Sequence, residues 1–144
     1  MDEANSSLQL ISIVVPCYNE ENTIGDLLEA IRSQTYPISK MEVVIADGMS
    51  ADRTRSVIDA FEKSNPELNI QLIDNPKRNI PSALNLAIDA SQGEIIIRLD
   101  AHSAPAPDYV KQCVKILNET HAANVGGVWI IRPGKAGSVA KGIA

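Results

Sequence analysis

The chain has 144 residues, 44% of them hydrophobic and 22% charged, with a formal net charge of −5 at pH 7. This length and composition are typical of one globular domain and exclude a disordered chain. The acidic balance, without a cluster of Lys and Arg, excludes a general nucleic-acid-binding surface. Cys17 and Cys113 lie far apart in the sequence, which indicates neither a zinc site nor a disulfide framework and favours a reducing compartment.

The sequence leads us to expect no secretory signal at the start of the chain. Residues 1–9 form a polar, acidic tail that lacks the basic and apolar regions of a secretory signal. No apolar run later in the chain approaches the roughly 18 residues of a transmembrane helix. We therefore expect a cytoplasmic protein whose folded domain spans residues 10–132.

Short apolar runs alternate with helical patterns along this domain. The first run, 11–15, predicts a buried strand that Pro16 ends, and Asn22 is a favourable N-cap for a helix. That helix would bury one apolar stripe, formed by Ile24, Leu27, Leu28 and Ile31. The second run, 43–46, predicts a strand, and Asp52 can cap the helix after it. That helix would bury Val57, Ile58 and Phe61.

Two further strand–helix units follow. Residues 70–73 predict the third strand, and Pro81 suits the first turn of the helix that comes next. Residues 94–99 predict the fourth strand, and a helix begins near Asp108. The apolar residues of this last helix recur at helical spacing, at Val110, Cys113, Val114 and Leu117.

A last apolar run, 125–131, resembles a fifth strand, and its Trp129 is expected in the core. Parallel strands need crossover connections, which helices usually supply. The alternation of strands and helices therefore predicts an α/β fold, with a mainly parallel, Rossmann-like sheet and helices on both faces.

A different polar cluster follows each of the first four predicted strands. The clusters are Pro16–Glu20, Asp47–Asp52, Asn75–Asn79 and Asp100–His102. The carboxyl ends of parallel strands meet at one edge of a sheet, where ligands of α/β proteins bind. An aromatic ring, a carboxylate beside a glycine, a cationic pair and potential metal ligands together suit a nucleoside diphosphate.

The Asp100-Ala101-His102 sequence is the most informative of these clusters. Its carboxylate and imidazole stand two residues apart, directly after the apolar run 95–97. A turn-forming Asp and a solvated His would explain the pair as well. As a metal site, the pair would suit Mn²⁺ better than Mg²⁺, because imidazole is a poorer ligand for the harder ion.

In this order and spacing, the clusters resemble the family-2 glycosyltransferases, which have the GT-A nucleotide-diphospho-sugar-binding fold. The matching segments are Ile13-Val14-Val15-Pro16 with Tyr18-Asn19-Glu20, Asp47-Gly48 followed by Ser50, Asp52 and Thr54, Asn79–Asn85, and Asp100-Ala101-His102. The resemblance covers about Leu10 to Ile131. The string Arg98–Ser103, followed by Pro105, Pro107, Asp108 and Tyr109, is similar to the subgroup that builds bacterial exopolysaccharides such as succinoglycan.

The resemblance implies roles for individual residues. Tyr18 would stack on or flank the base, Asp47 would accept the imide hydrogen of uracil, and Arg78 would pair with the pyrophosphate. The implied nucleotide-binding set is Pro16, Tyr18, Glu20, Asp47, Arg78 and Asp100. Asp100 and His102 would hold the cation, Mn²⁺ or Mg²⁺. His102 stands where the family usually has Asp, which leaves the identity of the cation open.

The activity implied is that of an inverting hexosyltransferase, which moves a sugar from a UDP-sugar to a glycan or lipid-linked acceptor in polysaccharide biosynthesis. Such a reaction also needs a carboxylate as general base. No Asp or Glu occurs after Glu119, and the Gln-Xaa-Xaa-Arg-Trp segment of the resembling enzymes is absent. We therefore expect an N-terminal fragment, inactive alone, in which residues 133–144 begin the acceptor-binding part and the base lies beyond Ala144. The full-length protein would associate with the cytoplasmic face of the membrane only through its C-terminal part.

Several alternatives remain open from the sequence. A nucleotide-sugar-binding module without turnover fits the missing base, and a nucleotidyltransferase fits the same fold. A receiver-like signalling domain would need adjacent acids after the first strand, where Cys17-Tyr18-Asn19 supplies none. A dehydrogenase is disfavoured, because no Gly-Xaa-Gly-Xaa-Xaa-Gly follows any predicted strand.

Overall fold

The structure is a computed structural model that describes residues 7–128 and Ile130. Four strands form one sheet: β1 (Ile11–Cys17), β2 (Met41–Asp47), β3 (Asn69–Asp74) and β4 (Ile95–Arg98). Their order is β3-β2-β1-β4, and every neighbouring pair is parallel. The helices are α2 (Ile24–Arg32), the short 3₁₀ helix η1 (Ile38–Lys40), α3 (Thr54–Ser64), α4 (Ile80–Ala90) and α5 (Tyr109–Thr120). The predicted α/β fold is confirmed.

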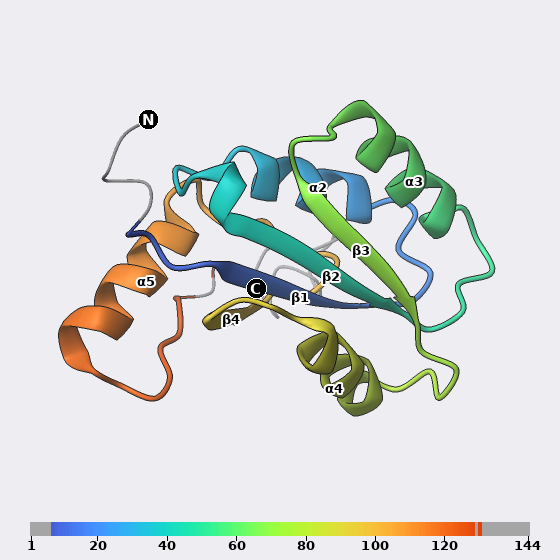
Figure 1. The fold of residues 1–144 in the computed structure, drawn as a ribbon. Helices are drawn as coiled ribbons and strands as arrows, with labels where there is room; N and C mark the ends of the chain where they lie inside the picture. The colour runs from blue at the N-terminus through green and yellow to red at the C-terminus, as the bar shows by residue number, and fades with distance from the viewer. Residues whose placement is uncertain (1–6, 129, 131–144) are drawn as a thin grey trace, which may run out of the picture.

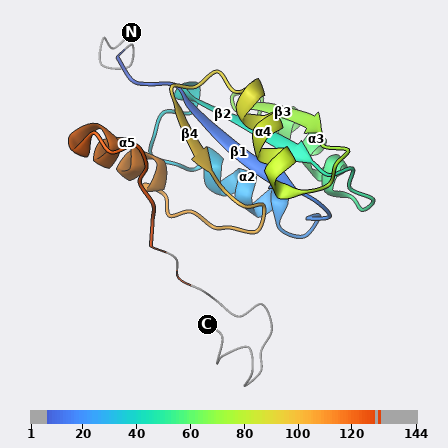
Figure 2. The same ribbon diagram turned by 90° about the horizontal axis from the view of Figure 1, so that it is seen from below.

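The sheet separates two apolar layers (Figure 1). On one face, alternate residues of β1 such as Ile13 and Val15 pack with the buried sides of α2 and α5, and Ile58 of α3 joins them. On the other face, α4 lies across β1 and β2 (Figure 2) and packs the small side chains Ala83 and Ala87 against Val14 and Val44. The period of two in a strand sends neighbouring side chains to opposite faces, so both layers come from continuous apolar runs.

Pro16 does not end β1, as the sequence suggested, because the strand continues to Cys17. Val14 directs its carbonyl toward β4, where Leu99 N–H donates to it at 3.1 Å. By the alternation of a strand, residue 16 would point its N–H the same way. β4 stops at Arg98, which pairs with Val14, so the missing N–H of Pro16 costs no ladder hydrogen bond.

Two helix starts differ slightly from the predicted ones. The N-cap position of α2 is Thr23 rather than Asn22. The N-cap position of α3 is Arg53, yet the predicted Asp52 still accepts a hydrogen bond from the N–H of Thr54 at 2.9 Å. Asp52 therefore satisfies a free helical donor from one position earlier, as capping side chains do.

The expected fifth strand at 125–131 is wrong for the residues described. Residues 125–128 and Ile130 form no strand, and Trp129 and Ile131 lie outside the described residues. Gly126 and Gly127 have low strand propensity. The segment instead runs against α5, where a Cβ on Gly127 would lie 2.6 Å from a ring carbon of Tyr109. The segment 133–144 also lies outside the described residues.

None of the helices among the described residues is long and apolar enough to cross a membrane.

Candidate functional site

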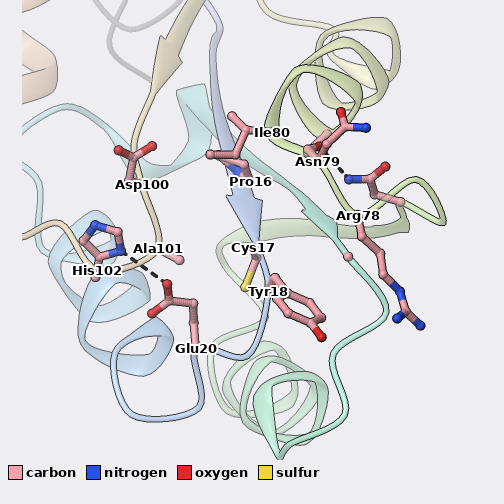
Figure 3. Close-up of a pocket in the computed structure, with 13 residues that line it drawn as sticks. Pro16, Cys17, Tyr18, Glu20, Arg78, Asn79, Ile80, Asp100, Ala101 and His102 are labelled. Carbon is pink, nitrogen blue, oxygen red and sulfur yellow. Dashed lines mark hydrogen bonds and ion pairs between the residues drawn. The ribbon is translucent and has the colours of Figure 1, made fainter.

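A pocket of about 180 Å³ opens at the carboxyl edge of the sheet (Figure 3). We call it the first pocket. Every strand end contributes to it, directly or through the loop that follows. Its lining residues are Pro16, Cys17, Tyr18, Glu20, Gly48, Asn75, Arg78, Asn79, Ile80, Ala83, Asp100, Ala101 and His102. This is the edge at which parallel α/β sheets bind ligands.

Six of the seven residues predicted for the site line this pocket. They are Pro16, Tyr18, Glu20, Arg78, Asp100 and His102. In Figure 3, Tyr18 and Arg78 lie toward one side, and Asp100 and His102 lie on the other. Tyr18 is 48% exposed, so one face of its ring is open to a ligand.

Asp47 is the exception, because it lies behind the pocket wall that its neighbour Gly48 forms. Its side chain is fully buried. One carboxylate oxygen accepts from the Ser50 hydroxyl at 2.5 Å. The other accepts from the Ser50 N–H at 3.0 Å and from Arg55 Nε at 2.7 Å. Arg55 also bonds Asp74, which ends β3 in register with Asp47.

Ser50 also connects the buried Asp47 carboxylate to the loop after β1. Its hydroxyl accepts from the N–H of Asn19 at 2.8 Å, and Asn19 Oδ1 accepts from the N–H of Ala51 at 2.9 Å. Thr54 Oγ1 accepts in turn from the N–H of Glu20 at 2.8 Å. These reciprocal bonds fasten the loops after β1 and β2 to each other, which holds the Tyr18 side of the pocket in place.

The backbone is also unusual around the pocket. Asn19, Met49 and Arg78 all have positive φ, at 52°, 61° and 54°. Asn tolerates this left-handed region, whereas Met and Arg rarely adopt it. One such residue follows each of β1, β2 and β3. Backbone strain of this kind tends to gather at ligand sites.

Asn75 is a pocket residue that the sequence analysis did not single out. It is only 2% exposed, and its Nδ2 donates to the Asn79 carbonyl at 3.0 Å. Its Oδ1 is buried and has no hydrogen-bond partner among the described residues. Buried acceptors are normally hydrogen-bonded, so this oxygen could accept a hydrogen bond from a ligand. The sequence placed Asn75 in the polar cluster after the third predicted strand, but it did not indicate that this oxygen would lack a partner.

Cys17 supplies a thiol to the lining of the first pocket. The thiol is buried at the pocket wall. Burial, and then the nearby Asp47 carboxylate, raise the pKa of Cys17 to about 12. A thiol that stays protonated is neither a nucleophile nor a metal ligand at neutral pH.

The loop after β4 carries the predicted cation ligands. Asp100 Oδ1 accepts from Arg98 Nη2 at 3.0 Å, and His102 Nδ1 lies 3.3 Å from Glu20 Oε1. Among the described residues, no three His, Cys, Asp or Glu side chains group closely enough to hold a metal ion on their own. The chemistry of the pair still fits a divalent cation that takes its other ligands from phosphate and water.

A second, larger pocket of about 790 Å³ adjoins the first and shares Asp100 and His102 with it. Its walls are mostly apolar and include Pro105, Tyr109 and Val128. The two pockets therefore form one continuous site, with Asp100 and His102 between them.

The comparisons with known proteins identify the family of the chain. The family model described as glycosyl transferase family 2 matches residues 12–143. The succinoglycan biosynthesis protein ExoA of Rhizobium meliloti is 36% identical over 126 residues, which are 86% of this chain and 37% of that protein.

Solved structures give the same result. The mannosyltransferase PcManGT from Pyrobaculum calidifontis, in complex with GDP-Man and Mn²⁺, is 34% identical with a TM-score of 0.73, over 78% of this chain and 33% of that one. Glucosyl-3-phosphoglycerate synthase from Mycobacterium tuberculosis, in complex with Mn²⁺, UDP and glucosyl-3-phosphoglycerate, is 25% identical with a TM-score of 0.63, over 80% and 42%. The chain spans less than half the length of these proteins. By the match to its model, which covers most of the sequence, this chain belongs to glycosyl transferase family 2.

Proposed function

We propose that the first pocket binds the nucleoside-diphosphate sugar of a glycosyl transfer reaction. The observation that carries this proposal is the convergence of a half-exposed aromatic ring, a guanidinium and a carboxylate–imidazole pair on one cavity. Aromatic faces take bases, guanidinium groups take phosphate oxygens, and carboxylate and imidazole take divalent cations. Two relatives of known structure hold a nucleoside diphosphate with Mn²⁺.

The proposed base is uracil. Tyr18 supplies the stacking face, and Asp47 and Asn75 are the acceptors next to it. The Asn75 Oδ1 lacks a donor, and the uracil imide N–H is one. Asp47 would reach the base only if Ser50 gave up part of its bonding. Guanine also carries N–H donors, and PcManGT holds GDP-Man, so GDP is the competing nucleotide.

The proposed diphosphate site lies between Arg78 and the loop after β4. Arg78 would pair with phosphate oxygens, and Asp100 with His102 would hold the cation, Mn²⁺ in preference to Mg²⁺. Asp100 and His102 would hold this cation where it would supply positive charge to the leaving diphosphate. The chain's own residues bind and orient the donor.

The second pocket is the proposed place for the sugar and the acceptor, a glycan or a lipid-linked glycan. It begins where the diphosphate would end, at Asp100 and His102. The acids that line the two pockets are Glu20 and Asp100, and both are already paired, with His102 and Arg98. No unpaired carboxylate lines either pocket among the described residues. We therefore propose that this chain binds the donor and does not transfer the sugar by itself.

The proposed place of this reaction is the cytoplasmic face of the membrane, in polysaccharide biosynthesis. In support, Cys17 and Cys113 are both free and buried, as is usual in a reducing compartment. The relative ExoA is a succinoglycan biosynthesis protein.

Calorimetric titration with UDP, GDP, CDP and ADP in the presence of Mn²⁺ tests the donor assignment. We expect UDP to bind most tightly, because cytosine lacks the imide hydrogen. Equal affinity for all four nucleotides would contradict base recognition in this pocket, and tightest binding of GDP would replace uracil with guanine.

Release of UDP from UDP-glucose, with and without a lipid-linked acceptor, tests the catalytic part. We expect at most slow hydrolysis, because general-base catalysis typically supplies about 100- to 10,000-fold in rate. Acceptor-stimulated turnover would show that a base lies within the chain, and Asp108 and Glu119 would be the first residues to substitute.

A further inference from the structure

We infer that Glu20 is a positioning residue that fixes the tautomer of His102, so that Nδ1 carries the proton and Nε2 presents its lone pair to the cation. The inference rests on the proposed cation site and assigns Glu20 a role different from direct nucleotide contact. The contact between Glu20 and His102 joins the loop after β1 to the loop after β4 at the wall of the first pocket (Figure 3).

The contact itself sets the direction of the hydrogen bond. His102 Nδ1 lies 3.3 Å from Glu20 Oε1. An ionised carboxylate only accepts hydrogen bonds, so the imidazole nitrogen must donate. In a neutral imidazole one nitrogen donates and the other accepts, which leaves Nε2 unprotonated, on the side of the ring away from Glu20.

Glu20 is held firmly enough to impose this choice. Its Oε2 accepts from the Thr23 hydroxyl at 2.6 Å, and its own N–H donates to Thr54 Oγ1 at 2.8 Å. The side chain is 25% exposed, whereas that of His102 is 67% exposed. The less exposed and more firmly bonded Glu20 therefore orients His102.

The same bonds argue against Glu20 as a cation ligand. Thr23 takes one of its oxygens and His102 the other. Asp100 differs, because Arg98 Nε and Nη2 both donate to Oδ1 alone. Metal-bound imidazoles commonly donate their second N–H to a carboxylate, which fixes the ring and raises its basicity. Glu20, His102 and a cation would form such a series.

Two measurements on the 144-residue chain test the inference. The first is the ¹⁵N NMR signal of His102 at pH 8, without metal or nucleotide. We expect the shifts of a protonated Nδ1 and an unprotonated Nε2, and we expect Glu20→Ala to lose this preference. The second is the affinity for Mn²⁺ in the presence of UDP, measured by electron paramagnetic resonance. We expect Glu20→Gln to lower it about tenfold or more, as outer partners of metal ligands do.

Glu21→Gln is the matched control. It removes the same charge from the next residue, whose carboxylate pairs with Arg53 at 3.0 Å. An equal loss of Mn²⁺ affinity in both variants, or a protonated Nε2 in the unsubstituted chain, would overturn the inference. UDP affinity without metal separates the two proposals. If UDP binds but Mn²⁺ has no effect, the Glu20 inference fails and donor binding stands, whereas no UDP binding at all contradicts the proposed function.

Discussion

The two sides of the first pocket are built differently. On the base side, defined by Tyr18, Asp47, Ser50 and Asn75, the loops after β1 and β2 are fastened by hydrogen bonds around a fully buried carboxylate. The cation side is defined by Asp100 and His102. The Asp100 carboxylate is partly exposed and pairs with Arg98, two residues earlier, and the exposed His102 pairs with Glu20 of the loop after β1.

This contrast indicates which part of the site is formed before a ligand binds. In the part of the chain that the structure describes, the base side satisfies most of its polar groups and leaves the buried acceptor Asn75 Oδ1 without a donor. The cation side offers two candidate ligands, Asp100 and His102, and would need ligands from elsewhere for a full coordination shell. Under the proposed function, the base side is formed before the ligand binds, and the diphosphate and the cation would complete the other side together.

The largest expected effect compares one substitution on the two sides. Asp47→Ala removes three hydrogen bonds from Ser50 and Arg55, and we expect it to lower the free energy of unfolding by about 2–3 kcal/mol. Asp100→Ala breaks a surface ion pair with Arg98, and we expect a change below about 1 kcal/mol. Urea unfolding measures both. Equal losses of stability would remove the contrast between the two sides.

The same pair of variants should separate in nucleotide binding. Without divalent cation, we expect Asp47→Ala to weaken UDP about ten- to hundredfold, because a hydrogen bond to a charged group contributes about 1.5–3 kcal/mol. Asp100→Ala should leave this metal-free affinity unchanged. Titration calorimetry in EDTA gives both values, and Asp47→Asn, which keeps the shape of the side chain, controls for local unfolding. If Asp100→Ala instead weakened UDP binding without metal, the cation side would contribute to metal-free nucleotide binding, which contradicts the contrast.

Tyr18 gives a smaller effect within the base side. Base–aromatic stacking is worth about 1–3 kcal/mol, and a ring that is half exposed should lie at the lower end. We therefore expect Tyr18→Ala to weaken UDP about five- to tenfold with little change in stability. Tyr18→Phe keeps the ring and should bind as the unsubstituted chain does. A loss in both variants would assign the effect to the hydroxyl rather than to stacking.

The smallest effect concerns Cys17, whose pKa is raised to about 12. The folded thiol should resist iodoacetamide at pH 8, whereas the urea-unfolded chain should react, as peptide mapping by mass spectrometry would show. The folded state keeps the proton that the unfolded state loses above its ordinary value of 9.0. Stability from this group is therefore present below pH 9 and declines as pH rises toward 12. Rapid alkylation of the folded chain would mean that the base-side wall opens.

Much of the fold could be predicted from the sequence, because its strands are continuous apolar runs and its helices carry apolar stripes. The predictions failed where pairing between strands determines the structure. β1 continues through Pro16 because β4 has already ended beside it. The end of a neighbouring strand cannot be read from the local sequence around Pro16. Residues 125–128 are apolar enough for a strand but pair with none in the described part of the chain.

The sequence predicted which residues lie at the site better than it predicted what each of these residues contacts. Residues after four different strands were expected together, and six of the seven line one pocket. The burial of Asp47 and the orphan oxygen of Asn75 depend on Arg55 and Asn79, whose side chains or backbone approach only in the folded state. Pairing of Glu20 with His102 likewise joins residues that are 82 positions apart.

The most direct test crosses two ligands with two conditions: UDP and UMP, each titrated in Mn²⁺ and in EDTA. A preformed base side should bind both nucleotides in EDTA. Mn²⁺ should raise the affinity for UDP about tenfold or more and change that for UMP little, because the cation side is completed by the diphosphate. An equal gain for UMP, or no gain for UDP, would contradict the division of this pocket into a preformed base side and a ligand-completed cation side.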